Sequence, residues 1–232
     1  MATACSFIHS HPRSKDSRYP ATRLWGGVAS VHNRAVNADE LRSIVAESLA
    51  LKQDFFGKAG VQVLEAGHIM VEALRAGSKI LAFGNGGSAA DAQHFTGELV
   101  NRFGFDRPAL PAISLTTDTS VLTSIANDSD FRMVFRRQVE ALGSPGDVAL
   151  AISTSGNSPN VLEAVAACRE RKVKSIGLAG RDGGALAGQV DLCLTVPHRV
   201  TSRIQEVHSM IVHLLCQAIE EELFPREAGS AG

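Results

Sequence analysis

Hydroxyl side chains are concentrated in one short segment of the sequence, STSGNSP at residues 153–159. The segment follows a continuously apolar stretch at 148–152, which is typical of a strand covered on both faces. Pro159 suits the first position of a helix, and Ser158 suits its cap. Hydroxyl groups and free amides at a helix N-terminus favour an anion, and the lack of a lysine favours a monophosphate over a nucleotide. The alternative is a capped turn without a ligand.

A second turn of unusual composition, GNGGS at residues 84–88, follows the apolar stretch 79–83. Its glycines allow backbone N–H groups to approach a ligand closely, and Ser88 can cap the helix that follows. The third glycine of a dinucleotide-binding fingerprint is missing. The turn therefore indicates either a ligand loop of another kind or a tight turn with a helix cap.

Two pairs of polar side chains could add chemistry to these turns. His94 and Glu98 are four residues apart, so they lie on one face of the helix expected after Ser88. Gln205 and His213 are eight residues apart on the last expected helix, which places them within about 80° of each other around its axis. The first pair is either a surface contact or, two turns from a ligand loop, part of a site, whereas the second pair could line one broad pocket.

Strands and helices alternate after the first 75 residues, which predicts an α/β fold with a parallel sheet of about five strands flanked by helices. Before them, apolar periodicity predicts two leading helices, at 37–56 and 58–74, the second ending at Gly77. Strands are expected at 79–83, 112–115, 148–152, 175–178 and 191–196, and helices at 88–103, 119–126, 130–142, 159–171, 184–189 and 201–224.

Composition divides the chain into a disordered N-terminal extension at 1–36, one domain at 37–224 and a tail at 225–232. The formal net charge of -1 gives no basic surface for nucleic acid, and no apolar run is long enough to span a membrane. The four cysteines include no CxxC pair, which favours reduced thiols and a cytoplasmic location.

The two turns, in this order on this pattern of strands and helices, resemble the sugar isomerase (SIS) domain family. Three further segments, HFTGEL at 94–99, AND at 126–128 and RIQEVH at 203–208 with His213 beyond, resemble the phosphoheptose isomerases within it. The resemblance covers about residues 37–224. It implies a single SIS domain that converts sedoheptulose 7-phosphate to D-glycero-D-manno-heptose 7-phosphate through an enediolate, the first step of heptose precursor synthesis.

The resemblance also implies roles for single residues. Glu98 and His213 match the general base and the acid of the reaction. Arg102, one turn beyond Glu98, is either a contact to the sugar or phosphate or a solvated side chain. The expected substrate-binding residues are Asn85, Gly86, Gly87, Ser88, Glu98, Arg102, Asn127, Asp128, Ser153, Thr154, Ser155, Ser158 and Gln205.

Family members bind one zinc ion through residues that match His94, Glu98, Gln205 and His213. A carboxylate that ligates a metal is a weaker base, so Glu98 cannot fully serve both tasks in one state, and glutamine is an uncommon zinc ligand. The family also forms homotetramers, which implies active sites at subunit interfaces. Gln205 and His213 are separated by about 12 Å along their helix, which predicts that His213 completes a pocket whose Glu98 belongs to another chain.

Two other functions compete with an isomerase. Some relatives are non-catalytic SIS proteins that bind the bacterial replication initiator and lack the base and the acid, whereas this chain has both Glu98 and His213. A sugar-phosphate-sensing transcription regulator would need a helix-turn-helix region, and residues 1–36 show none. An assay of aldose–ketose conversion discriminates among the three.

Overall fold

A computed structural model describes residues 36–226 of the 232-residue chain, and the chain divides into units at 1–41 and 42–232. The extension predicted for residues 1–36 and the tail predicted for 225–232 lie outside the described residues, except for 36, 225 and 226. Within the described part of the first unit, Asn37 caps the first helix. Its Oδ1 accepts hydrogen bonds from the amides of Asp39 and Glu40 at 3.0 and 2.9 Å, and Glu40 Oε2 accepts from the Asn37 amide at 3.0 Å.

The prediction of two leading helices is wrong, because α1 runs without a break from Ala38 to Arg75. Gly57 and Gly60, at the expected break, lie inside this helix, where each costs about 1 kcal/mol relative to alanine. Buried side chains on both sides, Phe55 and Val63, offset that cost by packing into the core. The predicted end is confirmed, since Gly77 has φ 80° and the Ser78 amide donates to the carbonyl of Ala73 at 3.0 Å.

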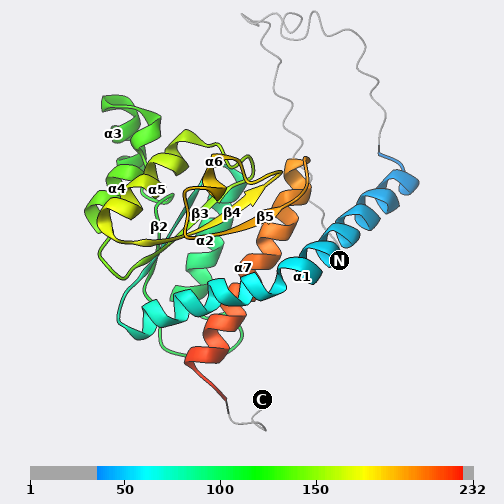
Figure 1. The fold of residues 1–232 in the computed structure, drawn as a ribbon, viewed down its shortest axis with the longest axis horizontal. Helices are drawn as coiled ribbons and strands as arrows, with labels where there is room; N and C mark the ends of the chain where they lie inside the picture. The colour runs from blue at the N-terminus through cyan, green and yellow to red at the C-terminus, as the bar shows by residue number, and fades with distance from the viewer. Residues whose placement is uncertain (1–35, 227–232) are drawn as a thin grey trace, which may run out of the picture. The chain divides into compact units, whose positions relative to one another are not determined.

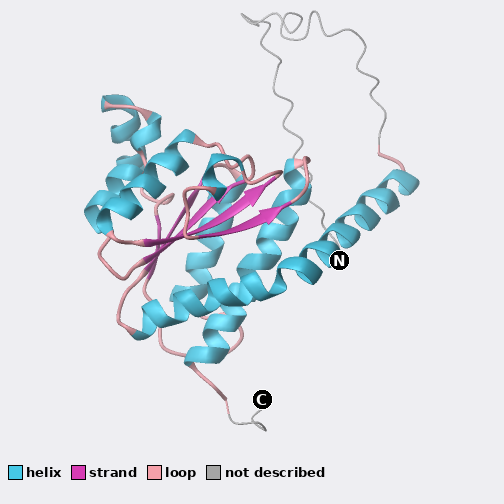
Figure 2. Cartoon of the chain, viewed as in Figure 1, coloured by secondary structure: helices cyan, strands magenta, loops and turns pink. Residues whose placement is uncertain are grey.

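The five predicted strands are confirmed and form one parallel sheet in the order β2-β1-β3-β4-β5. Figures 1 and 2 show the sheet between helices that cover its two faces. The strands are β1 (Ile80–Gly84), β2 (Ala112–Ser114), β3 (Val148–Ser153), β4 (Lys174–Gly180) and β5 (Leu192–Val196). The chain order reverses at β1 and β3, and such a reversal opens a crevice at the carboxyl ends of the strands.

The helices after α1 follow the predicted pattern, with one subdivision. The stretch expected as one helix at 130–142 contains a 3-10 turn at Phe131–Met133 and then α4, with Asp130 accepting a hydrogen bond from the amide of Arg132 at 2.7 Å. The helices are α2 (Gly87–Val100), α3 (Thr119–Asp128), α4 (Arg136–Leu142), α5 (Pro159–Arg171), α6 (Gly184–Ala187) and α7 (Thr201–Leu223).

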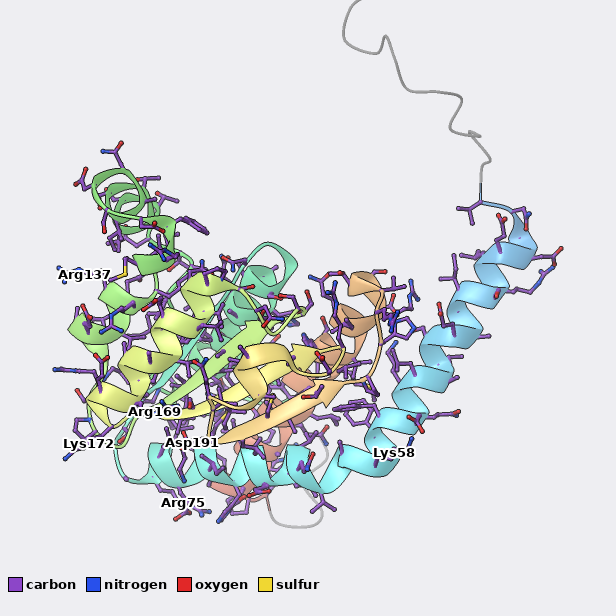
Figure 3. All side chains as sticks on the ribbon, turned by 45° about the horizontal axis from the view of Figure 1, so that its top comes forward. Lys58, Arg75, Arg137, Arg169, Lys172 and Asp191 are labelled. Atoms are coloured by element: carbon purple, nitrogen blue, oxygen red, sulfur yellow. The ribbon has the colours of Figure 1, made fainter. Side chains whose placement is uncertain are left out.

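Alternate strand residues supply two separate cores. One, between the sheet and α1, α2 and α7, contains Ile80, Ala82 and Ile152, while the other, toward α4 and α5, contains Leu81 and Phe83. The side chains drawn in Figure 3 fill both layers. Because the sheet is covered on both faces, polar groups for a site are available mainly at the strand ends.

Side chains of α1 are fixed to α7 at two places. Arg75, labelled in Figure 3, pairs with Glu72 at 2.8 Å and with Glu222 at 3.0 Å. Nearer the start of α7, the Ser48 hydroxyl donates to Glu206 at 2.5 Å. Among the described residues, no helix is long and apolar enough to cross a membrane.

Candidate functional site

The two polar turns lie at the carboxyl ends of the neighbouring strands β1 and β3. From β1 the chain continues into α2, which packs in the core shared with α1 and α7. From β3 it continues into α5, which packs in the core on the other face of the sheet. The turns therefore separate toward opposite faces and form the two sides of one crevice.

The hydroxyl groups of residues 153–158 form a compact network. Ser153, which is 3% exposed, lies with its Oγ 2.9 Å from Ser158 Oγ and 3.4 Å from Ser155 Oγ. Ser158 is the N-cap residue of α5 and Pro159 its first residue, as predicted, but the Ser158 side chain makes no capping hydrogen bond. Its hydroxyl bonds to Ser153 instead, so the first amides of α5 lack a side-chain cap and remain available to an anion.

The segment after β4 packs against the same turn and supports it. Gly156 has φ 66°, and a Cβ there would collide with the backbone of Gly183. The Asn157 amide group donates to the carbonyl of Ser155 at 3.0 Å and accepts from the Ala185 amide at 3.0 Å. This bracing holds the hydroxyl groups in place before any ligand binds.

The turn after β1 differs from its prediction at Ser88. Gly86, with φ 56°, occupies the N-cap position of α2, whereas Ser88 is the second residue of the helix and is 3% exposed. The prediction of Ser88 as the cap is therefore wrong, because the positive φ that precedes the helix falls on Gly86.

An asparagine that the sequence argument missed joins the two turns. The side-chain amides of Asn85 and Asn160 each donate to the other at 2.8 Å. Asn160 is buried at the start of α5. The pair therefore fixes the glycine turn after β1 against the turn at residues 153–158, called the hydroxyl turn below. Its position directly after Pro159 was the available signal, but the sequence alone does not pair it with Asn85.

Gln205 reaches the crevice from α7. A Cβ placed on Gly87 would lie 2.9 Å from Gln205 Cδ, so the side-chain amide sits directly against the start of α2. Glycine at position 87 leaves the room that this approach requires. Gln205 therefore lies beside the glycine turn, and its predicted contacts with substrate and zinc stay predictions.

His94, Glu98 and His213 meet between α2 and α7. His94 Nε2 lies 3.1 Å from Glu98 Oε1 and 3.4 Å from His213 Nε2, with the two imidazole rings nearly perpendicular. These contacts lie within one chain, and the expectation that His213 completes a pocket whose Glu98 belongs to another chain stays a prediction. The helical separation of Gln205 from His213 does not prevent the contacts within one chain, because Gln205 contacts the start of α2 while His213 reaches its middle.

Asp91 is a further carboxylate beside this cluster that the sequence argument missed. Burial raises the pKa of Asp91. The Ser209 hydroxyl, which donates to Oδ1 at 2.8 Å, and the nearby His94 and His213 partly oppose this rise. Its Oδ2 is buried without a hydrogen-bond partner among the described residues. Asp91 precedes His94 by three positions, and that helical spacing is the signal that could have identified it.

Three predicted site residues lie apart from this cluster. Asn127 and Asp128 are exposed at the end of α3, where the Asn127 amide donates to Asp128 Oδ1 at 2.7 Å. Arg102 is exposed just beyond the end of α2. The hydrogen bonds among the described residues do not bring them to the histidines or to the hydroxyl turn, so their substrate contacts stay predictions. Thr154, half-buried within the hydroxyl turn, stays with that turn.

A groove of about 900 Å³ adjoins the hydroxyl turn at Ser155 and Asn157. Its other walls are formed by the residues that directly follow β4, by those that directly follow β5, and by α1. The remaining lining residues are Glu47, Arg181, Asp182, Pro197, His198, Arg199 and Val200. This volume is in the range of small-molecule pockets, so a ligand held at the hydroxyl turn has room beside it.

Comparisons with known proteins agree on one family. Residues 45–180 match the family model described as the SIS domain. A phosphoheptose isomerase of Aromatoleum aromaticum is 57% identical over 177 residues, 75% of this chain and 89% of the relative. The structure of phosphoheptose isomerase GmhA from Neisseria gonorrhoeae is 47% identical, with a TM-score of 0.75 over 79% of this chain and 98% of that chain. A phosphoheptose isomerase from Francisella tularensis is 40% identical, with a TM-score of 0.77 over 79% and 97%.

Proposed function

The chain belongs to the phosphoheptose isomerase family of SIS-domain proteins, and from that premise we propose that it interconverts sedoheptulose 7-phosphate and D-glycero-D-manno-heptose 7-phosphate. The observations that carry this proposal are the meeting of Glu98, His94 and His213 between α2 and α7, and the braced set of hydroxyl groups in the turn after β3. One part supplies proton-transfer groups, and the other supplies an anion site. An aldose–ketose isomerase of a sugar phosphate needs both.

We propose that the phosphate group binds at residues 153–158, against the hydroxyl groups and the first amides of α5. Those amides lack a side-chain cap, and the helix dipole favours negative charge at this end. Asn85 and Gln205 then face the sugar from the other side of the crevice, because Asn85 is held by Asn160 and Gln205 by its contact with Gly87.

The reaction moves one proton between neighbouring carbons. In our proposal the Glu98 carboxylate removes the proton from the carbon beside the carbonyl and returns it to the former carbonyl carbon. His213 gives a proton to the carbonyl oxygen as the enediolate forms and takes one from the neighbouring hydroxyl as it collapses. His94 lies against both side chains and fixes their separation. Atoms and charge balance over the cycle, as an isomerisation requires.

The two histidines of this cluster have the spacing of zinc ligands. Two nitrogen ligands of a tetrahedral zinc ion stand about 3.4 Å apart, given zinc–nitrogen distances of 2.0–2.1 Å, and the Nε2 atoms of His94 and His213 are 3.4 Å apart. We propose that His94, Glu98 and His213 hold one zinc ion per subunit in a state distinct from the one in which Glu98 acts as the base. Gln205, which contacts the start of α2, stays a predicted fourth ligand. Such an ion polarises a substrate oxygen when it is bound. Metal content of the purified protein, measured beside a His94→Gln variant, tests this.

A second cluster competes for metal among the described residues. Ligand atoms of His68, Glu72 and Glu222 all lie within 4.8 Å of one another. Arg75 already pairs with both of its carboxylates, at 2.8 and 3.0 Å, and a guanidinium there opposes a second cation. A His68→Gln variant is therefore the matched control for His94→Gln and should keep its metal content.

We also propose a homotetramer with its active sites at subunit interfaces. Apolar side chains on α1 are exposed in the single chain, among them Val61 at 78%, Leu64 at 64% and Leu49 at 56%. The His94 side chain is 42% exposed, so one side of the cluster is open in the single chain. A neighbouring copy over that side would exclude water from the enediolate. Light scattering of the eluted protein measures the mass directly, and a monomer would refute the proposal.

For the setting of the protein, we propose the cytoplasm. The cysteines Cys168, Cys193 and Cys216 are free, which suits a reducing compartment. We propose no nucleic-acid partner, since the net charge of -1 provides no basic surface.

Turnover on a panel of five-, six- and seven-carbon sugar phosphates tests the proposed function. We expect the seven-carbon ketose and aldose phosphates to interconvert fastest. The rival function, a non-catalytic SIS protein that binds the replication initiator, predicts no turnover of any of them. The identities of 57% and 47% to phosphoheptose isomerases favour the enzyme.

A further inference from the structure

A buried ion pair joins the far ends of the two helices that carry the cluster. Arg107 Nε donates to Glu220 Oε1 at 2.9 Å, and each side chain is 2% exposed. Glu220 also accepts hydrogen bonds from the amides of Phe103 and Gly104, at 2.9 and 2.6 Å. Charges taken out of water are costly unless their hydrogen bonds are complete, and both oxygens of this carboxylate have partners.

The other nitrogens of Arg107 close the end of α2. Nη2 donates to the carbonyl of Glu98 and Nη1 to that of Leu99, both at 2.8 Å. The last carbonyls of a helix have no partner within it, and the negative end of the helix dipole favours a cation there. Arg107 thus holds the backbone of Glu98 itself, the residue proposed as the base.

Glu220 reaches the other half of the cluster. It follows His213 by seven residues, two turns along the same face of α7. The Phe103 ring, whose backbone amide Glu220 holds, lies 5.9 Å from the His213 ring. Burial opposes ionisation of Glu220, but the amides of Phe103 and Gly104 and the Arg107 guanidinium together hold its pKa below the usual value. The carboxylate therefore stays charged where the pair needs it.

A second buried ion pair, just before β1 and β3, has the same design. Asp147, 3% exposed at its side chain, pairs with Lys79 Nζ at 2.6 Å and accepts from the amides of Lys79 and Ser144 at 3.0 and 2.8 Å. The hydrogen bonds and the ion pair given for Lys79 and Asp147 among the described residues involve neither His94 nor Glu98 nor His213. The Lys79–Asp147 pair therefore tests stability without touching the site.

We propose that Arg107 and Glu220 are positioning residues of the isomerase, which lock the end of α2 to α7 so that Glu98 stays against His94, the residue that contacts His213. The inference rests on the proposed function for its kinetic consequence. The hydroxyl turn belongs to β3 and α5, so the pair should influence proton transfer and leave phosphate binding alone.

The test is a double variant, Arg107→Met with Glu220→Leu, because apolar replacement of a whole buried pair keeps most of the stability. We expect kcat for the heptose phosphate to fall about 10- to 100-fold, since small misplacements of reacting groups have effects of this size. KM and inhibition by inorganic phosphate should change by less than about two-fold. The control, Lys79→Met with Asp147→Leu, should keep kcat within about two-fold of the wild type.

Hydrogen exchange provides a readout that needs no activity. The Asn101 and Leu110 amides donate to the carbonyls of Gly97 and Leu99, so their exchange should accelerate in the Arg107/Glu220 variant and not in the control. A folded double variant with wild-type kcat and wild-type exchange would overturn the positioning role. So would a kcat loss no larger than that of a control with equal loss of melting temperature. If the wild type lacks isomerase activity while exchange responds as expected, the proposed function fails and the structural lock stands.

Discussion

The hydroxyl turn and the histidine cluster are built in opposite ways. Ser153 and Ser158, which bond at 2.9 Å, are five residues apart in the chain, whereas His94 and His213, 3.4 Å apart at Nε2, are separated by 119 residues. The first is a local structure fixed by one turn and one helix start. The second exists only when α2 and α7 pack correctly. The hydroxyl turn and the histidine cluster therefore depend on separate parts of the fold.

The two regions also differ in exposure. Ser153 is 3% exposed and its turn is braced by Asn157 and Gly183, while the His94 side chain is 42% exposed. A prebuilt, buried anion site and an open proton-transfer site suggest a division of labour. In the proposed function, the phosphate would anchor the substrate, and the substrate or a neighbouring subunit would complete the cover over the cluster.

The largest expected effect comes from Glu98→Gln. The amide keeps the shape of the side chain and its approach to His94 but cannot take a proton, so kcat should fall about 10²- to 10⁴-fold. Exchange of solvent protons into bound substrate should fall with it. Inhibition by inorganic phosphate should be unchanged, because the hydroxyl turn is intact.

Glu140→Gln is the control for this variant, since Glu140 also forms a pair at helical spacing, with Arg136 at 2.9 Å, but on α4. It should leave kcat unchanged. Near-normal proton exchange in a folded Glu98→Gln protein would contradict the assignment of the base.

The next largest effect is expected from Ser155→Ala combined with Ser158→Ala, which should weaken binding and leave proton transfer intact. Loss of two hydroxyls that bond an anion should raise both KM and the phosphate inhibition constant about 10- to 100-fold. The kcat at saturating substrate should change far less, because Glu98 and His213 are untouched. Ser144→Ala, an exposed serine at the opposite end of the sheet, is the control. Unchanged phosphate inhibition would show that the anion binds elsewhere.

The comparison also explains what the sequence could predict. The hydroxyl turn, with Pro159 opening α5, was predictable because its partners are neighbours in the chain. The five strands were predictable from short apolar runs between helical patterns. The pairing of His94 with Glu98 also follows from spacing alone, since four residues return to the same helix face.

Contacts between distant segments could not be predicted in this way. The Asn85–Asn160 pair and the Arg107–Glu220 pair each join residues whose own neighbourhoods give no sign of a partner. Local rules also failed where packing overrides them. Apolar periodicity predicted a break near residue 57 of α1, and Ser88 was predicted as a cap, but core packing continues the helix and the cap falls on Gly86.

A smaller effect is expected on the pH dependence of stability, through a histidine outside the cluster. His208, one and a half turns before His213 on α7, is fully buried, with Nε2 3.0 Å from the carbonyl of Ala179. Burial lowers its pKa to about 4 from about 6.5. The unfolded chain therefore gains a proton at higher pH than the folded one, so His208 contributes stability that is complete above about pH 6.5 and is lost as pH falls toward 4.

Lowering the pH from about 7.5 to about 5.5 should therefore reduce the free energy of unfolding by about 1 kcal/mol more in the wild type than in His208→Gln. Denaturant titrations at the two pH values measure the difference. His68→Gln, an exposed histidine on α1, is the control and should retain the wild-type difference. An equal pH response in the wild type and His208→Gln would contradict the assignment.

The smallest expected effect tests whether both regions are complete without the N-terminal extension. A truncated chain that begins at Val36 retains Asn37, whose side chain caps α1, and Glu40, which returns the bond. The hydroxyl turn and the cluster draw all of their described contacts from residues beyond position 84. We therefore expect the melting temperature to change by less than about 2 °C and kcat and KM by less than about two-fold.

A second truncation that also removes Asn37 takes away the cap, which should lower the stability of the start of α1 by about 1 kcal/mol without changing kcat. Loss of activity in the first truncation would mean that the extension completes one of the two regions, and whether KM or kcat changes would identify which one.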